Sequence, residues 1–250
     1  MKTIAIFNNK GGVAKTTTVI NVAYTLSNTM EKKILIIDCD GQQNASRFFS
    51  DNISRLGIEH SIITSAASPV HSLSHTRYKN IDILTSTSDM NECASFFNEL
   101  RAEEKNYNMT KIKNYLKYSD YDYVFLDMPP TLNCITEQLL SISDGVIVPV
   151  ELGTFAIQGI AKVTETINKV NASFIGCFIS KFDVHNRADN ELKQLLSSTL
   201  GNKIFDTVIP YSNIIRNSIN YRLTAFEYMH WLSPTKKYID LTKEIIRKVG

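Results

Sequence analysis

Short apolar runs rich in β-branched residues alternate with longer segments of helical pattern along the chain. The apolar runs fall at residues 3–8, 33–38, 81–86, 123–128, 145–151, 173–182 and 203–210. The helical patterns fall at residues 15–29, 89–104, 109–119, 133–143, 156–171, 188–200 and 234–249. Nearly continuous apolar strands are typical of a parallel sheet that helices cover on both faces. The alternation therefore predicts an α/β fold with a doubly wound, mostly parallel sheet flanked by helices.

The size and composition fit one buried core. The chain has 250 residues, of which 43% are hydrophobic, and it shows no internal repeat or linker, so we expect a single domain over residues 1–250. No apolar leader precedes the first strand, and no run approaches the roughly 18 to 20 apolar residues that cross a bilayer. The four cysteines are widely scattered, which favours reduced thiols. We therefore expect a cytoplasmic protein.

A glycine-containing loop follows the first predicted strand. The segment "NNKGGVAKTTT" at residues 8–18 joins that strand to a helical pattern. Gly11 and Gly12 let the backbone approach a phosphate chain, Lys15 adds a cation, and Thr16 offers a hydroxyl to Mg²⁺. The residues predicted to bind the nucleotide here are Lys10, Gly11, Gly12, Val13, Ala14, Lys15, Thr16 and Thr17.

This loop resembles the deviant Walker A box of the ParA/MinD family of ATPases. "KGGVAKTT" agrees with the pattern K-G-G-x-G-K-[ST]-[ST] except at Ala14, where the family has glycine. The added methyl group falls at a turn that needs an unusual φ, so we expect a slow ATPase. The resemblance implies a P-loop NTPase fold. It also implies that Lys10 reaches the phosphates of a partner subunit, which ties ATP hydrolysis to an ATP-dependent homodimer.

Two further motifs resemble the family's metal and water sites. "DCDGQQNAS" at residues 38–46 matches the family at Asp38 and Asp40, and "YDYVFLDMPP" at residues 121–130 matches at Asp127. The resemblance implies that Asp38 and Asp127 hold Mg²⁺-bound water and that Asp40 orients the attacking water. Gly41 stands where the family has proline, from which we expect a more mobile loop.

The agreement becomes weaker towards the C-terminus. Residues 143–160 still resemble the family's next strand and helix, whereas "NYRLTAFEYM" stands where the family has an E-A-P segment. "DTVIP" at residues 206–210 resembles the strand after which the family contacts adenine. The resemblance therefore implies base contacts from Pro210 and Tyr211.

Charge is distributed unevenly along the chain. Residues 1–150 carry 14 Lys and Arg against 16 Asp and Glu, whereas residues 151–250 carry 13 against 9. By resemblance to ParA-type partition ATPases, we expect the ATP dimer to bind nonspecific DNA, to associate with the nucleoid and to be stimulated by a ParB-like adaptor. Arg187, Arg216 and Arg222 are the candidate DNA contacts. Because the chain opens on the first strand, we expect no separate DNA-reading domain before it.

Three alternatives remain open. A MinD-like cell-positioning ATPase would need an amphipathic membrane helix at the C-terminus, but we expect "YIDLTKEIIRKVG" to pack on the sheet, with no stable membrane association. A positioning ATPase for a protein cargo would use the same nucleotide site. A nitrogenase-reductase-like iron–sulfur protein would use Cys93 and Cys134 as cluster ligands, although glycines expected around such a ligand are missing at Cys93.

Overall fold

The computed structural model describes residues 1–250 and contains one seven-stranded sheet. Its strands are β1 (Lys2–Ile6), β2 (Ile34–Asp38), β3 (Leu73–His75), β4 (Ile81–Leu84), β5 (Tyr123–Asp127), β6 (Gly145–Glu151) and β7 (Phe174–Ser180). The strand order is β3-β4-β2-β5-β1-β6-β7, and every neighbouring pair is parallel except β3 with β4. The predicted doubly wound, mostly parallel sheet is confirmed.

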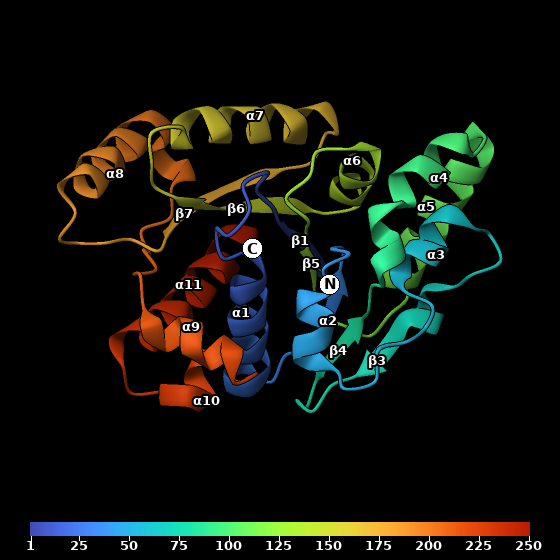
Figure 1. Cartoon of the computed structure of the whole chain (residues 1–250), viewed down its shortest axis with the longest axis horizontal. Helices are drawn as coiled ribbons and strands as arrows, with labels where there is room; N and C mark the ends of the chain where they lie inside the picture. The colour runs from blue at the N-terminus through green and yellow to red at the C-terminus, as the bar shows by residue number, and fades with distance from the viewer.

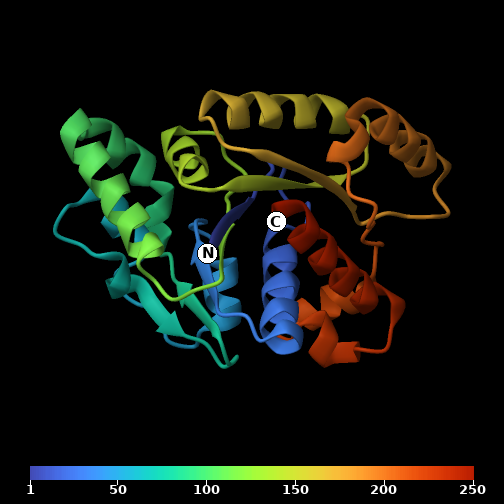
Figure 2. The ribbon, with the colours of Figure 1, turned by 180° about the vertical axis from the view of Figure 1, so that it is seen from behind.

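Helices cover both faces of this sheet (Figure 1). One face carries α3 (Ile58–Ile63), α4 (Cys93–Glu99), α5 (Ala102–Lys117), α6 (Cys134–Ser141), α7 (Ala156–Lys169) and α8 (Arg187–Leu200). The other face carries α1 (Lys15–Met30), α2 (Asn44–Phe49), α9 (Asn213–Asn220), α10 (Ala225–Met229) and α11 (Ser233–Val249). Seen from behind, α1 and α11 lie side by side against the sheet (Figure 2). Each face therefore has its own buried hydrophobic cluster.

The last helix turns its apolar side inward. Tyr238, Leu241 and Ile245 of α11 are almost completely buried in the cluster that also contains α1. The expectation that this segment packs on the sheet is confirmed. None of the helices combines the length and the apolar composition needed to span a bilayer.

The prediction of a strand at residues 203–210 is wrong. This segment forms no continuous ladder with β7: it makes one isolated bridge to β7, Ile204 with Cys177, and one to the residue pair beyond it, Pro210 with Phe182. Single backbone hydrogen bonds join Phe205 to Cys177 and Ile209 to Ile179. Between them, the backbone N–H groups of Asp206 and Thr207 donate to the carboxylate of Glu244 on α11, at 2.8 and 2.9 Å. The Glu244 side chain therefore accepts the backbone hydrogen bonds that a neighbouring strand would accept in a sheet.

The prediction of one continuous helix over residues 89–104 is also wrong. The chain forms a short 3₁₀ turn at Ser88–Asn91, then α4, and α5 begins only at Ala102. Leu100 and Arg101 have extended backbones, with ψ of 146° and 155°, which separates the two helices. The sequence patterns did not predict β3, α2, α3, α9 or α10.

The sheet order brings the candidate motifs together. Strands β2, β5 and β1 are neighbours at its centre, and Asp127 lies in register with both Asp38 and Ile6. Because the three strands are parallel, the loops that follow them emerge at the same edge. The glycine-containing loop and the two strand-end aspartates therefore lie together.

Candidate nucleotide-binding site

The loop between β1 and α1 has the backbone of a phosphate-binding turn. Gly12 has φ of 76°, and Ala14, directly before the first residue of α1, has φ of 71° and ψ of 31°. A left-handed backbone costs a residue with a Cβ about 1–2 kcal/mol. The expectation that Ala14 occupies a turn with an unusual φ is confirmed.

Asn8 and Lys15 brace this loop from inside. The side-chain amide of Asn8 donates to the carbonyl of Pro149 at 2.8 Å, and its oxygen accepts the N–H of Lys10 at 3.0 Å. The Lys15 ammonium donates to the carbonyls of Asn8 and Lys10, each at 3.1 Å. Burial lowers the pKa of Lys15, while the charges of Asp127 and Asp40 raise it. The Lys15 side chain is thus a buried cation beneath the loop, whereas the side chain of Lys10 is exposed.

Asp38 is held by donors from the loop that follows β2. One of its oxygens accepts the N–H and the hydroxyl of Ser46, both at 2.7 Å, and the other accepts the N–H of Asp40 at 3.1 Å. Burial raises the pKa of Asp38, and these hydrogen bonds lower it. The side chain of Asp40 accepts the N–H of Gln42 at 2.9 Å and faces the cleft described below.

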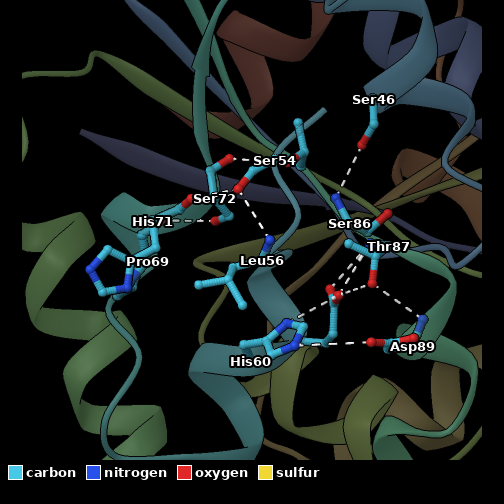
Figure 3. A network of polar contacts seen from close by, with 12 residues as sticks. Ser46, Ser54, Leu56, His60, Pro69, His71, Ser72, Ser86, Thr87 and Asp89 are labelled. Atoms are coloured by element: carbon cyan, nitrogen blue, oxygen red, sulfur yellow. Dashed lines mark hydrogen bonds and ion pairs between the residues drawn. The ribbon is translucent and has the colours of Figure 1, made fainter. Parts of the chain in front are cut away.

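A serine supports this loop from the neighbouring strand end (Figure 3). The N–H of Ser86 donates to the Ser46 hydroxyl at 3.1 Å, and the Ser86 hydroxyl donates to the carbonyl of Asp40 at 2.7 Å. Gly41 lies against the side chain of Asn91, whose Cγ would be 2.6 Å from a Cβ at that position. A proline would therefore not fit here without displacing Asn91.

Asp127 differs from Asp38 because its carboxylate has no hydrogen-bond partner. Both oxygens are buried and accept no hydrogen bond, at the strand end beside the first turn of α1, where Thr16 and Lys15 lie close enough to lower the pKa of this carboxyl. Burial, followed by the nearby charge of Asp38, raises the pKa of Asp127. A buried carboxylate without a partner is costly, and a hydrated cation would satisfy it. These carboxylates and the Thr16 hydroxyl are oxygen donors of the kind that Mg²⁺ prefers, so the residues fit this ion.

A cleft of about 830 Å³ opens over the loop. Its lining includes the phosphate loop, the Asp40 segment and α9, with Gly11, Gly12, Ala14, Lys15, Thr16, Thr17, Asp40, Pro210, Tyr211, Ser212, Ile215 and Arg216 among its residues. The volume lies in the range of small-molecule sites. The structure therefore places Pro210 and Tyr211 at the same cleft as the predicted phosphate-binding residues. Val13, which belongs to the loop itself, is buried and does not face the cleft.

The three candidate DNA contacts lie in different settings. Arg187, which begins α8, pairs with Glu191 at 2.8 Å on an exposed surface. Arg216 lines the cleft from α9 and has an exposed side chain. Arg222 also lines the cleft, and its partly exposed side chain pairs with Asp51 and reaches the carbonyls of Phe48 and Ser50.

The sequence did not identify four residues at this site. Asn8 and Ser86 brace the loops, and Arg47 and Lys181 add cations to the cleft lining. Ser86 is the last residue of the strand predicted at 81–86, and Lys181 lies next to the end of the strand predicted at 173–182. Both are therefore at the sheet edge where ligands bind, which was the only local signal for them. Their contacts join segments far apart in the chain.

Comparison with known proteins agrees with this geometry. The family model AAA_31, described as an AAA domain, matches residues 1–177. The chromosome-partitioning ATPase Soj of Thermus thermophilus is 28% identical over 255 residues, covering 100% of this chain and 97% of that protein.

Two solved structures share the fold. McdA from Cyanothece, without nucleotide, superposes with a TM-score of 0.84 at 18% identity, covering 100% of both chains. The septum site-determining protein MinD from Pyrococcus horikoshii, complexed with Mg-ADP, gives 0.79 at 20% identity, covering 100% of this chain and 97% of that one. With a family model that matches more than half of its residues, and with these relatives, the chain belongs to the AAA_31 family and, within it, to the ParA/MinD family of ATPases.

Proposed function

We propose that residues 1–250 form one ATPase domain that hydrolyses ATP slowly, with Mg²⁺, and acts in DNA partition. The observation that carries the proposal is the convergence of the phosphate loop, Asp38, Asp40 and Asp127 at one sheet edge beneath one cleft. The name of the Thermus relative supports a role in partition, and the Mg-ADP in the MinD structure supports the ligand.

The residues around the phosphates have distinct roles in this proposal. Lys15 and the loop amides bind the phosphate chain, and the start of α1 directs its unpaired N–H groups towards it. Thr16, Asp38 and Asp127 hold Mg²⁺ directly or through water. When bound, this ion would supply positive charge that offsets the charge of the phosphates. Asp40 accepts a hydrogen bond from the attacking water and orients it.

Lys10 acts on a second copy of the chain. The backbone of Lys10 is fixed by Asn8 and Lys15, while its side chain is exposed and free of ion pairs. A cation presented outward from a fixed loop can reach the phosphates of a partner subunit. The proposed active form is therefore an ATP-dependent homodimer.

The base lies against Pro210 and Tyr211 in this proposal. Pro210 is bridged to Phe182 after β7, and the N–H of Tyr211 donates to the carbonyl of Phe182 at 2.9 Å. The ring of Tyr211 is 58% exposed at the rim of the cleft. A bound purine would cover this ring.

The ATP dimer binds nonspecific DNA on the nucleoid and is stimulated by a ParB-like adaptor. The net charge of +4 over residues 151–250 supports the DNA part of the proposal, because two copies would add their electrostatic attraction. Arg187, Arg216 and Arg222 are the proposed phosphate contacts. Arg187 and Arg216 are exposed, and the Arg222 side chain is 42% exposed beside its ion pair with Asp51.

A positioning ATPase for a protein cargo is the second candidate, supported by the shape it shares with McdA. A membrane-attached, MinD-like role receives less support, because the apolar side of α11 is buried. An iron–sulfur role also receives little support. Cys93 is fully buried in the hydrophobic cluster on one face of the sheet, whereas a cluster shared between two subunits would need its ligand at the surface.

The proposal is tested by measuring ATP hydrolysis with and without DNA. We expect Mg²⁺-dependent turnover, loss of ATP binding in Lys15→Ala, and retained binding and dimerisation with stalled turnover in Asp40→Ala. Unchanged ATP binding in Lys15→Ala by calorimetry would remove the basis of the proposal. DNA affinity that is the same with ADP and ATP would instead favour the cell-positioning alternative.

A further inference from the structure

The segment after β7 is fastened to the phosphate loop. The hydroxyl of Ser180, the last residue of β7, donates to the carbonyl of Val13 at 3.1 Å. The next residue, Lys181, has φ of 55°, in the left-handed region. The N–H of Phe182 then donates to the carbonyl of Ile209 at 3.0 Å. Lys181 is thus held in a costly backbone conformation between the phosphate loop and the segment that leads to Pro210.

This backbone directs the Lys181 ammonium towards Gly12 of the loop. Its Nζ lies 3.9 Å from the position that a Cβ on Gly12 would take. Lys181 lines the same cleft as Gly12, Lys15 and Thr16. Whereas the Lys15 ammonium is almost buried and bonded to loop carbonyls, the Lys181 side chain is 38% exposed.

The present partner of Lys181 is weakly bound. Its Nζ is 3.4 Å from an oxygen of Glu151 at the end of β6, and the Glu151 side chain is also about one-third exposed, at 34%. Ion pairs with this much solvent exposure contribute at most about 1 kcal/mol. A phosphate chain carries several negative charges and offers more acceptors than one carboxylate. The ammonium can therefore change partner at little cost.

We propose that Lys181 is a second phosphate-binding lysine of this site and that Glu151 holds it at the loop until nucleotide enters. This inference rests on the proposed nucleotide-binding function. In this inference, Lys181 makes the site prefer nucleotides with more phosphates, because the Lys181 ammonium contacts the phosphate chain and not the base. Glu151 is a positioning residue that acts through Lys181.

The test compares the binding of MgATP and AMP by calorimetry in Lys181→Met, Lys181→Arg and a control, Lys162→Met, whose exposed lysine lies on α7 away from the cleft. We expect Lys181→Met to weaken MgATP binding about tenfold or more, with AMP affected much less. Lys181→Arg should restore most of the affinity because it restores the charge. Lys162→Met should match the unmodified chain. Thermal unfolding of each variant checks that the fold is retained.

The variant Glu151→Gln provides a second, independent test that leaves Lys181 intact. It removes a negative charge from the mouth of the cleft, so MgATP affinity should stay the same or increase. The inference is overturned if Lys181→Met binds MgATP as well as the unmodified chain, or if MgATP and AMP lose affinity equally. If Lys15→Ala still loses binding in that case, the proposed function stands without this inference. If the unmodified chain binds no ATP, the proposed function itself fails.

Discussion

Arg222 pairs with Asp51 across 171 residues of sequence, with Nη1 2.6 Å from Oδ1. The same guanidinium reaches the carbonyls of Phe48 and Ser50 at the end of α2, at 3.4 and 3.5 Å. Since α2 begins in the loop that carries Asp40, this contact ties the C-terminal third of the chain to the candidate catalytic loop.

Arg222→Ala should lower the free energy of unfolding by about 1 kcal/mol, because it removes this pair and leaves the carbonyls at the end of α2 without their side-chain donor. Chemical denaturation measures the change. Arg187→Ala is the matched control and should change stability by less than about 0.5 kcal/mol, since its pair with Glu191 is highly exposed. Equal stability of the two variants would mean that the Arg222 contacts contribute nothing to the fold.

Ala14→Gly should stabilise the protein by about 0.5–1 kcal/mol, because glycine adopts the observed φ of 71° without the penalty that a Cβ brings. We also expect tighter ATP binding or faster turnover. Ala161→Gly, at an exposed position within α7, should instead destabilise by about 1 kcal/mol. A loss of stability in both variants would show that the turn is not strained by Ala14.

Asp127→Asn should raise the stability of the nucleotide-free protein at neutral pH, because it removes an ionisable group that burial and Asp38 disfavour in its charged form. The same variant should lose the dependence of ATP binding on Mg²⁺. Thermal unfolding and calorimetry with and without Mg²⁺ measure the two effects. Asp120→Asn, at an almost fully exposed position, should change neither. Mg²⁺-dependent binding that survives in Asp127→Asn would assign the ion to other residues.

Glu59 gives a prediction about pH. Its carboxylate is completely buried and accepts from the N–H of Thr87 at 3.2 Å, with His60 Nδ1 3.5 Å away. Figure 3 shows His60, Thr87 and Asp89 in the polar network of this region. Burial raises the pKa of Glu59 in the folded state above its unfolded value, although the Thr87 hydroxyl lowers it. Between these two pKa values the folded state binds more protons, so this group's contribution to stability falls as pH rises through that window.

Glu59→Gln should therefore be more stable than the unmodified chain at pH 7, because an amide can accept the Thr87 hydrogen bonds without a buried charge. The stability difference should shrink as the pH falls towards the unfolded pKa of about 4.3. Denaturation at several pH values measures it. If the stability difference instead grew as the pH fell, the pKa of Glu59 would be lowered in the folded state and not raised.

Lys10→Ala should bind ATP as a monomer and lose the ATP-dependent dimer, because in the proposed dimer the exposed ammonium acts on the partner's phosphates, while the Lys10 backbone contacts remain. Size-exclusion chromatography with a slowly hydrolysed ATP analogue measures the dimer. Lys2→Ala, far along β1 from the loop, serves as the control. Dimerisation that persists in Lys10→Ala would remove this lysine from the interface.

Much of the fold followed from local patterns. Six of the seven apolar runs are strands, because a buried parallel strand needs β-branched residues along its whole length. The seventh run failed at Asp206 and Thr207, whose N–H groups bond to Glu244 from a helix 37 residues or more away. The 51–78 region, with its short α3 and the edge strand β3, lacks a long periodic pattern and was not predicted.

By itself, the sequence determined that a phosphate-type loop and three aspartates would meet, because each directly follows or ends a parallel strand and such ends share one edge of a sheet. Only the tertiary structure decided which other side chains join them. Lys181 reaches Gly12, and Arg222 pairs with Asp51, through contacts between segments that no local pattern relates. The left-handed backbone at both residues is held by this surrounding packing, since a lysine or an arginine alone disfavours it.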